Sequence, residues 1–313
     1  MAEAAQKTQK TTQKTTDAHD RWRPGGRRRP GGTARPGAAV SARVRVLTAL
    51  ALLVPLIAVI VVLPFFTDAA TTTVDYDAVR QAPSPGHPFG TDDSGRDVLV
   101  RAAAGARVSL MVALACALIA TVLGTLVGAA SGAAGGVVDS VVMRLVDGFN
   151  AVPHLLLGIL IVALYRGSLI AVIASVALTH WTTVARIVRA EVLSLRSRPY
   201  IDAAISGGAS RLTVLTRHLL PAVAPQSALA VVLLLPHAVW HETALSFLGL
   251  GLPPHLPSLG TMVADSRDDV LLGAWWTIAA PAGVLIAVTL AVAGLSGWWR
   301  DRLVPRRRSE LAL

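Results

Sequence analysis

Two histidines and a glutamate in one apolar stretch are the residues of this chain best suited to chemistry. His237 and His241 stand four positions apart, and Glu242 follows directly. Residues four apart share one face of a helix, so two imidazoles there could meet a transition metal. Ionisable groups inside a membrane are costly and usually face a cavity or a partner. We therefore predict that these three residues line a path, with the histidines as transient metal contacts.

The two histidines do not make a complete metal site, because two imidazoles are too few ligands. The alternative is that both are packing histidines held by hydrogen bonds. His154 and His180 are isolated in the sequence, and packing is the simpler interpretation for each. No firm metal site and no cofactor are predicted.

The sequence lacks the patterns expected of an enzyme. His241 and Glu242 have no second histidine placed for H-E-x-x-H, and no G-x-S-x-G turn is present. A phosphate-binding G-x-x-x-x-G-K-[ST] loop is absent as well. We therefore predict that the chain is not an enzyme and that any ATP is hydrolysed by another subunit.

The composition indicates a membrane protein. Of 313 residues, 53% are hydrophobic and 15% are charged, which is a low charge content for a soluble domain. Several apolar runs are long enough to cross a bilayer as helices. We predict an all-α integral membrane protein of about six transmembrane helices, near 44–66, 107–131, 137–164, 168–190, 222–248 and 276–299.

The charges indicate how those helices are oriented. Of the Lys and Arg residues, eleven lie in 1–45 and five in 300–308. Segment 67–98 holds six Asp, whereas loop 191–221 is basic. Lys and Arg collect on the cytoplasmic side, so we predict both termini inside and no nucleic-acid partner.

The predicted divisions follow the same runs. They are a disordered basic cytoplasmic tail (1–42), a first transmembrane helix (43–66), an external segment (67–106), a five-helix core (107–305) and a cytoplasmic tail (306–313). The basic tail can also contact lipid headgroups. Within the external segment we expect a short amphipathic piece around Asp97–Ala104 that lies along the outer surface.

Small and charged residues suggest how the helices pack. Gly124, Gly128, Gly132 and Gly136 are spaced by four, which lets another helix approach closely. A six-helix unit also leaves one apolar side open, so the stripe suits a neighbouring helix of a partner. At the inner end of the third helix, Arg144 could pair with Asp147 at i, i+3.

The basic loop 191–221 carries local signals for two short helices. Ser197 can cap the first, Pro199 suits its first turn, and Gly207-Gly208 can end it. Ser210 can cap the second, which we expect to end near Leu220 before Pro221. Ala203 and Ala204 give a flat face that a partner protein can approach.

Several motifs in this order resemble one family. The loop reads Asp-Ala-Ala, three residues, Gly208, and later Leu220-Pro221, similar to the coupling loop of ABC-importer permeases. HPFGTDDSGRDVLVR, GARVSLMVAL, GGVVDSVVMRLVDGFNAVP and HETALSFLGLGLPP resemble the second permease of the peptide/opine/nickel group. The resemblance covers most of 86–305 and implies the type I importer permease fold. Asp202 stands where the family usually has Glu.

The resemblance implies a function and a set of partners. It implies a bacterial plasma-membrane permease subunit that carries nickel, a metal chelate or di- or oligopeptides. Its partners would be a homologous permease in a heterodimer, ATP-binding subunits and an extracytoplasmic binding protein. The coupling residues that it assigns are Tyr200, Asp202, Ala203, Ala204, Gly207, Gly208, Leu220 and Pro221. In the nickel branch a similar histidine pair precedes the S-F-L-G-L-G run. The alternative is a secondary transporter or channel without an ATPase, which usually shows repeats or rings of charge.

Overall fold

The computed structural model describes residues 51, 58, 73–253 and 256–303. The predicted basic tail 1–42, the tail 306–313 and, apart from residues 51 and 58, the first transmembrane helix 43–66 lie outside the described residues. The described residues belong to one compact unit.

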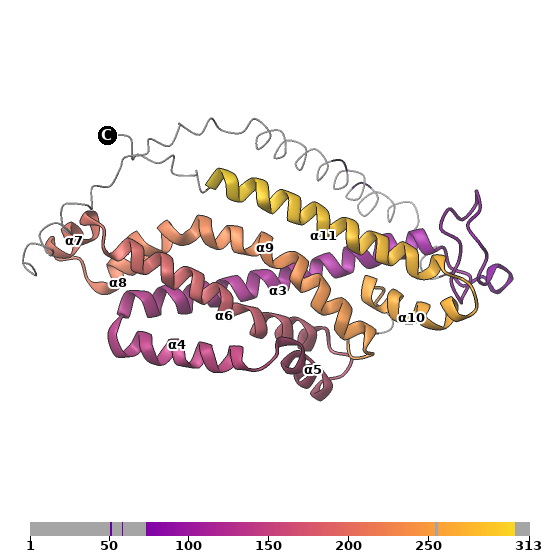
Figure 1. The fold of residues 1–313 in the computed structure, drawn as a ribbon, viewed down its shortest axis with the longest axis horizontal. Helices are drawn as coiled ribbons and strands as arrows, with labels where there is room; N and C mark the ends of the chain where they lie inside the picture. The colour runs from indigo at the N-terminus through magenta and orange to yellow at the C-terminus, as the bar shows by residue number, and fades with distance from the viewer. Residues whose placement is uncertain (1–50, 52–57, 59–72, 254–255, 304–313) are drawn as a thin grey trace, which may run out of the picture. The chain divides into compact units, whose positions relative to one another are not determined.

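The described residues are helical, with one isolated β-bridge between Thr91 and Asp97 and no strand among them. The helices that form the apolar bundle are α3 (Val98–Ala134), α4 (Gly136–Ala151), α5 (His154–Leu164), α6 (Leu169–Arg196), α9 (Leu220–Phe247) and α11 (Trp276–Leu303). The other helical segments are η1 (Tyr76–Ala78), α7 (Pro199–Ser206), α8 (Arg211–Val214), the π-helix η2 (Leu215–Leu219) and α10 (Leu259–Leu271). Figure 1 shows their arrangement.

Four helical stretches among the described residues are long and apolar enough to cross a membrane, and a bent pair makes a possible fifth. The four are Val98–Ala134, Leu169–Arg196, Arg211–Phe247 and Trp276–Leu295, and the bent pair is α4 with α5. The prediction of an all-α membrane protein is confirmed.

Helix α3 begins earlier than predicted and does not break. Asp97 caps it by accepting hydrogen bonds from the backbone N–H groups of Leu99 and Val100, at 2.8 and 3.1 Å. The helix then runs for 37 residues without a proline. The separate amphipathic piece expected at Asp97–Ala104 is therefore wrong, since those residues are the first turns of the spanning helix itself.

The glycine stripe on α3 is filled from within the same chain. A β-carbon on Gly124 would stand 2.5 Å from the carbonyl oxygen of Trp181, and one on Gly132 would stand 2.9 Å from Val192. Both neighbours belong to α6, so the absent side chains let these two backbones approach. The stripe does pack against a helix, but its use by a partner subunit, as predicted, is wrong.

The predicted third helix 137–164 is two helices. α4 and α5 meet at an angle of 81°, and Val152 between them is extended, with φ −86° and ψ 129°. Pro153 explains the break, because it lacks an N–H and disfavours helical geometry in the residue before it.

Helix α4 is tied to α6 by polar contacts. Asp139 receives two hydrogen bonds from Arg189, at 2.6 and 2.5 Å, and Asp147 receives one from Arg186 at 2.6 Å. The expected pair of Arg144 with Asp147 is wrong: Asp147 points across to the neighbouring helix, which offers a guanidinium at bonding distance.

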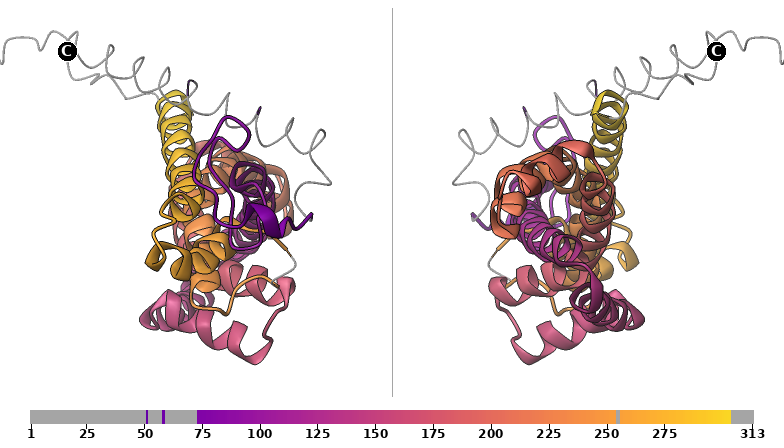
Figure 2. Two further views of the ribbon diagram at one scale, coloured as in Figure 1. Left: turned by 90° about the vertical axis from the view of Figure 1, so that its right-hand side faces the viewer. Right: turned by 90° about the vertical axis from the view of Figure 1, so that its left-hand side faces the viewer.

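The polar segments lie at opposite ends of the helices. α7 and α8 stand at one end, while segment 73–97 and α10 stand at the other (Figures 1 and 2). The basic loop and the acidic loops therefore lie at opposite ends, as the charge pattern predicts.

Candidate functional site: coupling helix, histidine pocket and external clamp

Helix α7 is a short helix whose inner face is anchored in the core. Ile201 is 1% exposed and packs with Val188, Val192 and Val214. Pro199 occupies the first turn, where its missing N–H breaks no bond. The predicted Ser197 cap is wrong, because Ser197 ends α6 and its Oγ donates to the carbonyl of Ser194 at 3.0 Å.

The end of α7 depends on Gly208. The Gly208 N–H donates to the Ile205 carbonyl at 2.9 Å, and the Ala209 N–H donates to the Ala204 carbonyl at 3.0 Å. These two bonds form the Schellman motif, which needs a left-handed residue between them. Gly208 supplies it with φ +89°, whereas Gly207 has an ordinary φ of −77°.

The second short helix does not stop at Pro221. Ser210 caps α8 by accepting a hydrogen bond from the Thr213 N–H at 3.2 Å, as predicted. A π-turn follows, in which the Leu220 N–H donates to the Leu215 carbonyl, and α9 continues through Pro221. The predicted helix end is wrong, because the backbone stays helical at Leu219 and Leu220 and Pro221 is the second residue of α9, which follows the π-turn directly.

The outer face of α7 and α8 carries small, acidic and apolar side chains. Asp202 and Ala203 are exposed, and Tyr200, Ile205 and Leu212 are 47%, 55% and 68% exposed. Exposed apolar side chains beside the flat face of Ala203 and Ala204 are typical of a surface that binds another protein. Tyr200 is among the residues predicted from the sequence for this contact, whereas Ile205 and Leu212 carry no motif signal.

The structure brings four histidines together at one pocket. His180 of α6 lies 4.7 Å from His241, 6.4 Å from His237 and 5.7 Å from His154, measured between ring centroids. All four line a cavity of about 520 Å³ between α5, α6 and α9. We call this cavity the histidine pocket. Its other lining residues are Thr183, Val184, Ile187, Gln226, Ala230, Leu233 and Leu234.

His237 and His241 therefore share a face of α9, and His154 of α5 and His180 of α6 join them at the pocket. The sequence gives no sign of this grouping, because only the bend at Pro153 and the packing of α6 on α9 bring His154 and His180 near the pair. Among the described residues, no group of three or more possible ligands is placed to hold a metal ion.

Glu242 lies apart from the histidine pocket and is fully buried. It accepts hydrogen bonds from the hydroxyls of Ser109, Ser246 and Ser258, at 2.9, 2.8 and 2.8 Å. Because Ser258 also caps α10, the carboxylate joins α3, α9 and α10. Glu242 does not line the pocket, and its sequence neighbours gave no hint of the serine partners.

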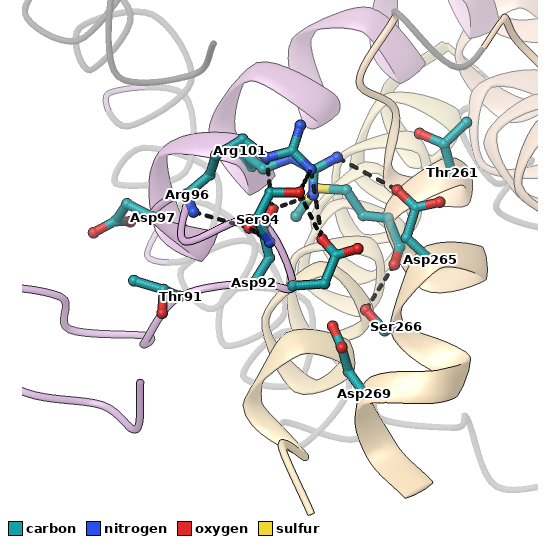
Figure 3. A network of polar contacts seen from close by, with 12 residues as sticks. Thr91, Asp92, Ser94, Arg96, Asp97, Arg101, Thr261, Asp265, Ser266 and Asp269 are labelled. Atoms are coloured by element: carbon teal, nitrogen blue, oxygen red, sulfur yellow. Dashed lines mark hydrogen bonds and ion pairs between the residues drawn. The ribbon is translucent and has the colours of Figure 1, made fainter. Parts of the chain in front are cut away.

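The external segment is clamped onto the helices by ion pairs (Figure 3). Arg101 of α3 bonds Asp92 at 2.5 Å and Asp265 of α10 at 3.4 Å. Arg80 bonds Asp269 at 2.6 Å, and the Trp276 indole N–H donates to the Thr91 carbonyl at 3.1 Å. These contacts join segment 73–97 to α3, α10 and α11, and we call them the external clamp.

The two carboxylates on Arg101 differ in their surroundings. Asp92 is buried and also accepts the backbone N–H groups of Ser94 and Arg96, at 2.9 and 2.8 Å. Asp265 has a half-exposed side chain. Burial raises the pKa of the Asp265 carboxyl, and Arg101 acts in the opposite direction.

The described residues thus form a bundle of apolar helices of spanning length, with a short exposed helix pair at one end and a clamped polar cap at the other, which defines an all-α membrane protein. Residues 120–309 match the family of binding-protein-dependent transport system inner membrane components. The chain belongs to this family and is a multi-pass inner-membrane permease of the ABC-importer class. The alternative of a secondary transporter or channel is set aside.

Curated relatives extend the match over most of the chain. The oligopeptide transport system permease protein OppC of Escherichia coli is 38% identical over 267 residues, 84% of this chain and 88% of that protein. The dipeptide transport system permease protein DppC of Bacillus subtilis is 33% identical over 262 residues, 84% of this chain and 82% of that protein. A probable peptide ABC transporter permease of Sinorhizobium fredii is 41% identical over 228 residues, 73% of this chain and 78% of that protein.

Proposed function

We propose that this chain is a permease subunit of an ATP-driven importer of di- or oligopeptides. The observation that carries the proposal is the 38% identity to a permease named for oligopeptide transport, over 84% of this chain. Its partners are a homologous permease in a heterodimer, separate ATP-binding subunits that hydrolyse the ATP, and an extracytoplasmic binding protein.

The proposed contact with the ATPase is the exposed tip of α7 and its connection to α9. Asp202 and Ala203 face outward there, while Ile201 fixes the helix to the core. The set also includes Tyr200, Ala204, Gly207, Gly208, Leu220 and Pro221. Because α7 follows α6 and leads through the π-turn into α9, a movement of its tip is passed to two spanning helices.

The proposed path for cargo runs through the histidine pocket. His237 and His241 line the cavity of about 520 Å³, which is large enough for a small peptide. Glu242 does not contact cargo in this proposal. Its hydrogen bonds hold α3, α9 and α10 together next to the path.

Nickel or a metal chelate is a second candidate cargo. The observation in its favour is the meeting of His154 and His180 with the predicted pair in one cavity. A loose group of imidazoles would release an ion again, which transport requires.

In the proposed orientation, both termini, α7 and α8 face the cytoplasm, and the external clamp faces outward. The basic loop at one end and the Asp-bearing segments at the other support it. The proposed division of the chain is 1–42 tail, 43–66 first span, 67–106 external segment, 107–305 core and 306–313 tail, with the boundary at 106 moved back to Val98, where α3 begins.

Reconstitution tests the function. The chain, its partner permease and the ATPase are placed in liposomes with the binding protein, and uptake of labelled trialanine and of Ni²⁺ is measured with and without ATP. We expect ATP-dependent uptake of trialanine. Ni²⁺ uptake without trialanine uptake would replace peptides by nickel as the cargo, and uptake of either without the ATPase would contradict the proposal.

A further inference from the structure

We infer that the histidine pocket receives a protonated amine of the cargo, with neutral imidazole nitrogens as hydrogen-bond acceptors. The inference rests on the proposed function, because it concerns cargo in the same cavity. It adds the chemical group that is recognised and assigns His180 to the site.

The hydrogen bonds of His180 determine which of its nitrogens faces a ligand. Its Nδ1 lies 2.9 Å from the backbone carbonyl oxygen of Val176. The Thr179 hydroxyl also lies 3.0 Å from Nδ1, but its proton is directed to the same Val176 carbonyl at 2.9 Å. A carbonyl only accepts, so the ring proton sits on Nδ1 and Nε2 keeps a lone pair. Among the described residues, no partner bonds Nε2. His180 lines the pocket and is 8% exposed as a residue, so this lone pair can accept a hydrogen bond from a donor in the cavity.

His237 repeats this arrangement one helix away. Its Nδ1 lies 3.3 Å from the Leu233 carbonyl oxygen, which again leaves Nε2 as an acceptor. The Nε2 of His154 faces the Asn150 side-chain oxygen at 3.5 Å. That oxygen is identified because the Asn150 amide nitrogen donates to the Val146 carbonyl at 2.8 Å.

The rest of the pocket favours a donor over an acceptor on the cargo. Its lining contains no Lys or Arg that would bind a carboxylate and no Asp or Glu that would trap a cation. The N–H groups of His180 and His237 are already used by backbone carbonyls. An ammonium group offers several N–H donors to the imidazole nitrogens that converge on the pocket. Because no carboxylate lines the pocket, the bound ammonium is held weakly enough for the cargo to be released.

Chemical labelling of the reconstituted assembly tests the inference. Diethyl pyrocarbonate modifies unprotonated imidazole nitrogens, and mass spectrometry reads each histidine separately. The exposed His237 is the reporter, and His218 and His87, which lie outside the pocket, are internal references. Labelling is compared with no addition, with trialanine, with N-acetyl-trialanine, and with Ni²⁺ alone.

We expect trialanine to protect His237, N-acetyl-trialanine to protect it much less, and the reference histidines to be unaffected. Equal protection by both peptides would overturn the amine contact and leave the pocket on the cargo path. Protection by neither peptide would overturn the inference together with the proposed path. Protection by Ni²⁺ but by neither peptide would assign the pocket to a metal cargo instead.

Two variants separate hydrogen bonding from packing. His237→Gln keeps an acceptor near the position of Nε2, whereas His237→Leu fills similar space without one. The uptake ratio of trialanine to its acetylated form should fall by about tenfold in the leucine variant, as expected for one hydrogen bond to a charged group. The glutamine variant should keep most of it. An equal loss in both variants would contradict an acceptor role.

Discussion

Two adjacent glycines at the end of α7 do different things. Gly208 has φ +89° and completes the Schellman motif, whereas Gly207 has φ −77°. A side chain at the left-handed position costs roughly 1–2 kcal/mol, and more when it is β-branched. Gly208→Val should therefore distort the turn that presents α7, and ATP-dependent uptake should be lost while the assembly remains in the membrane.

Gly148→Ala is a control outside the proposed contact set, because Gly148 lies in α4 without a positive φ and an added β-carbon would meet nothing within 4 Å. An alanine there adopts the existing backbone and should be neutral or stabilise by about 0.4–1 kcal/mol. Uptake and the yield of the assembly are measured for both variants. Normal uptake by Gly208→Val would contradict the importance of this turn.

The serines on α10 allow a second test. Ser258 caps the helix and bonds Glu242, whereas the Ser266 hydroxyl donates only to the Met262 carbonyl of the same helix. Ser258→Ala should lower stability by about 2–4 kcal/mol because it loses a cap and a bond to a buried carboxylate. Ser266→Ala should lower it by less than about 1 kcal/mol. The melting temperature in detergent compares the two, and equal values would contradict the bridging role of Glu242.

At the scale of elements, the external clamp makes unequal use of its two carboxylates. Asp92→Asn leaves the Arg101 guanidinium buried without its nearest partner and should cost about 3 kcal/mol. Asp265→Asn should leave the melting temperature unchanged or slightly higher. Folding raises the pKa of the Asp265 carboxyl. The free energy of unfolding of the protein therefore falls as the pH rises from the unfolded-state pKa to the folded-state pKa of this group. At neutral pH Asp265→Asn removes this destabilisation, because asparagine does not ionise.

The pH dependence gives the decisive comparison. Thermal melts of the wild type and of Asp265→Asn are recorded from acidic to neutral pH. The difference in melting temperature should grow in favour of the variant as the pH rises through the range where Asp265 ionises. A difference that changes in the opposite direction would show that the Arg101 contact outweighs burial.

Much of the helix layout could be predicted because an apolar run of spanning length has few other solutions. The break at Pro153 and the passage through Pro221 show the limit of local signals. A proline lacks an N–H in both places, but the helix breaks before Pro153, whereas at Pro221 it continues directly after a π-turn. The grouping of His154 and His180 with His237 depends on packing between three helices, and no local pattern encodes it.

At the scale of the whole molecule, labelling can test the orientation. Cysteines introduced at Ser84 and Asp268, both exposed, should react with impermeant reagents added outside, and one at Ser210 only after the inside is opened. Ser258 is buried and is unsuitable as a probe. The native Cys116 is buried and gives little background. External reaction at Ser210 would reverse the proposed topology.

The external clamp also has a consequence for the order of assembly during synthesis. Arg80 and Asp269 are separated by 189 positions, and Arg101 and Asp265 by 164. The ribosome therefore completes α3 long before α10 and α11 exist, so Arg80 is made without its partner Asp269, and Arg101 has only Asp92 to pair with. Contacts so distant in sequence form late. Docking of segment 73–97 is then a closing step of biogenesis, and a nascent chain released before α10 should expose that segment to protease.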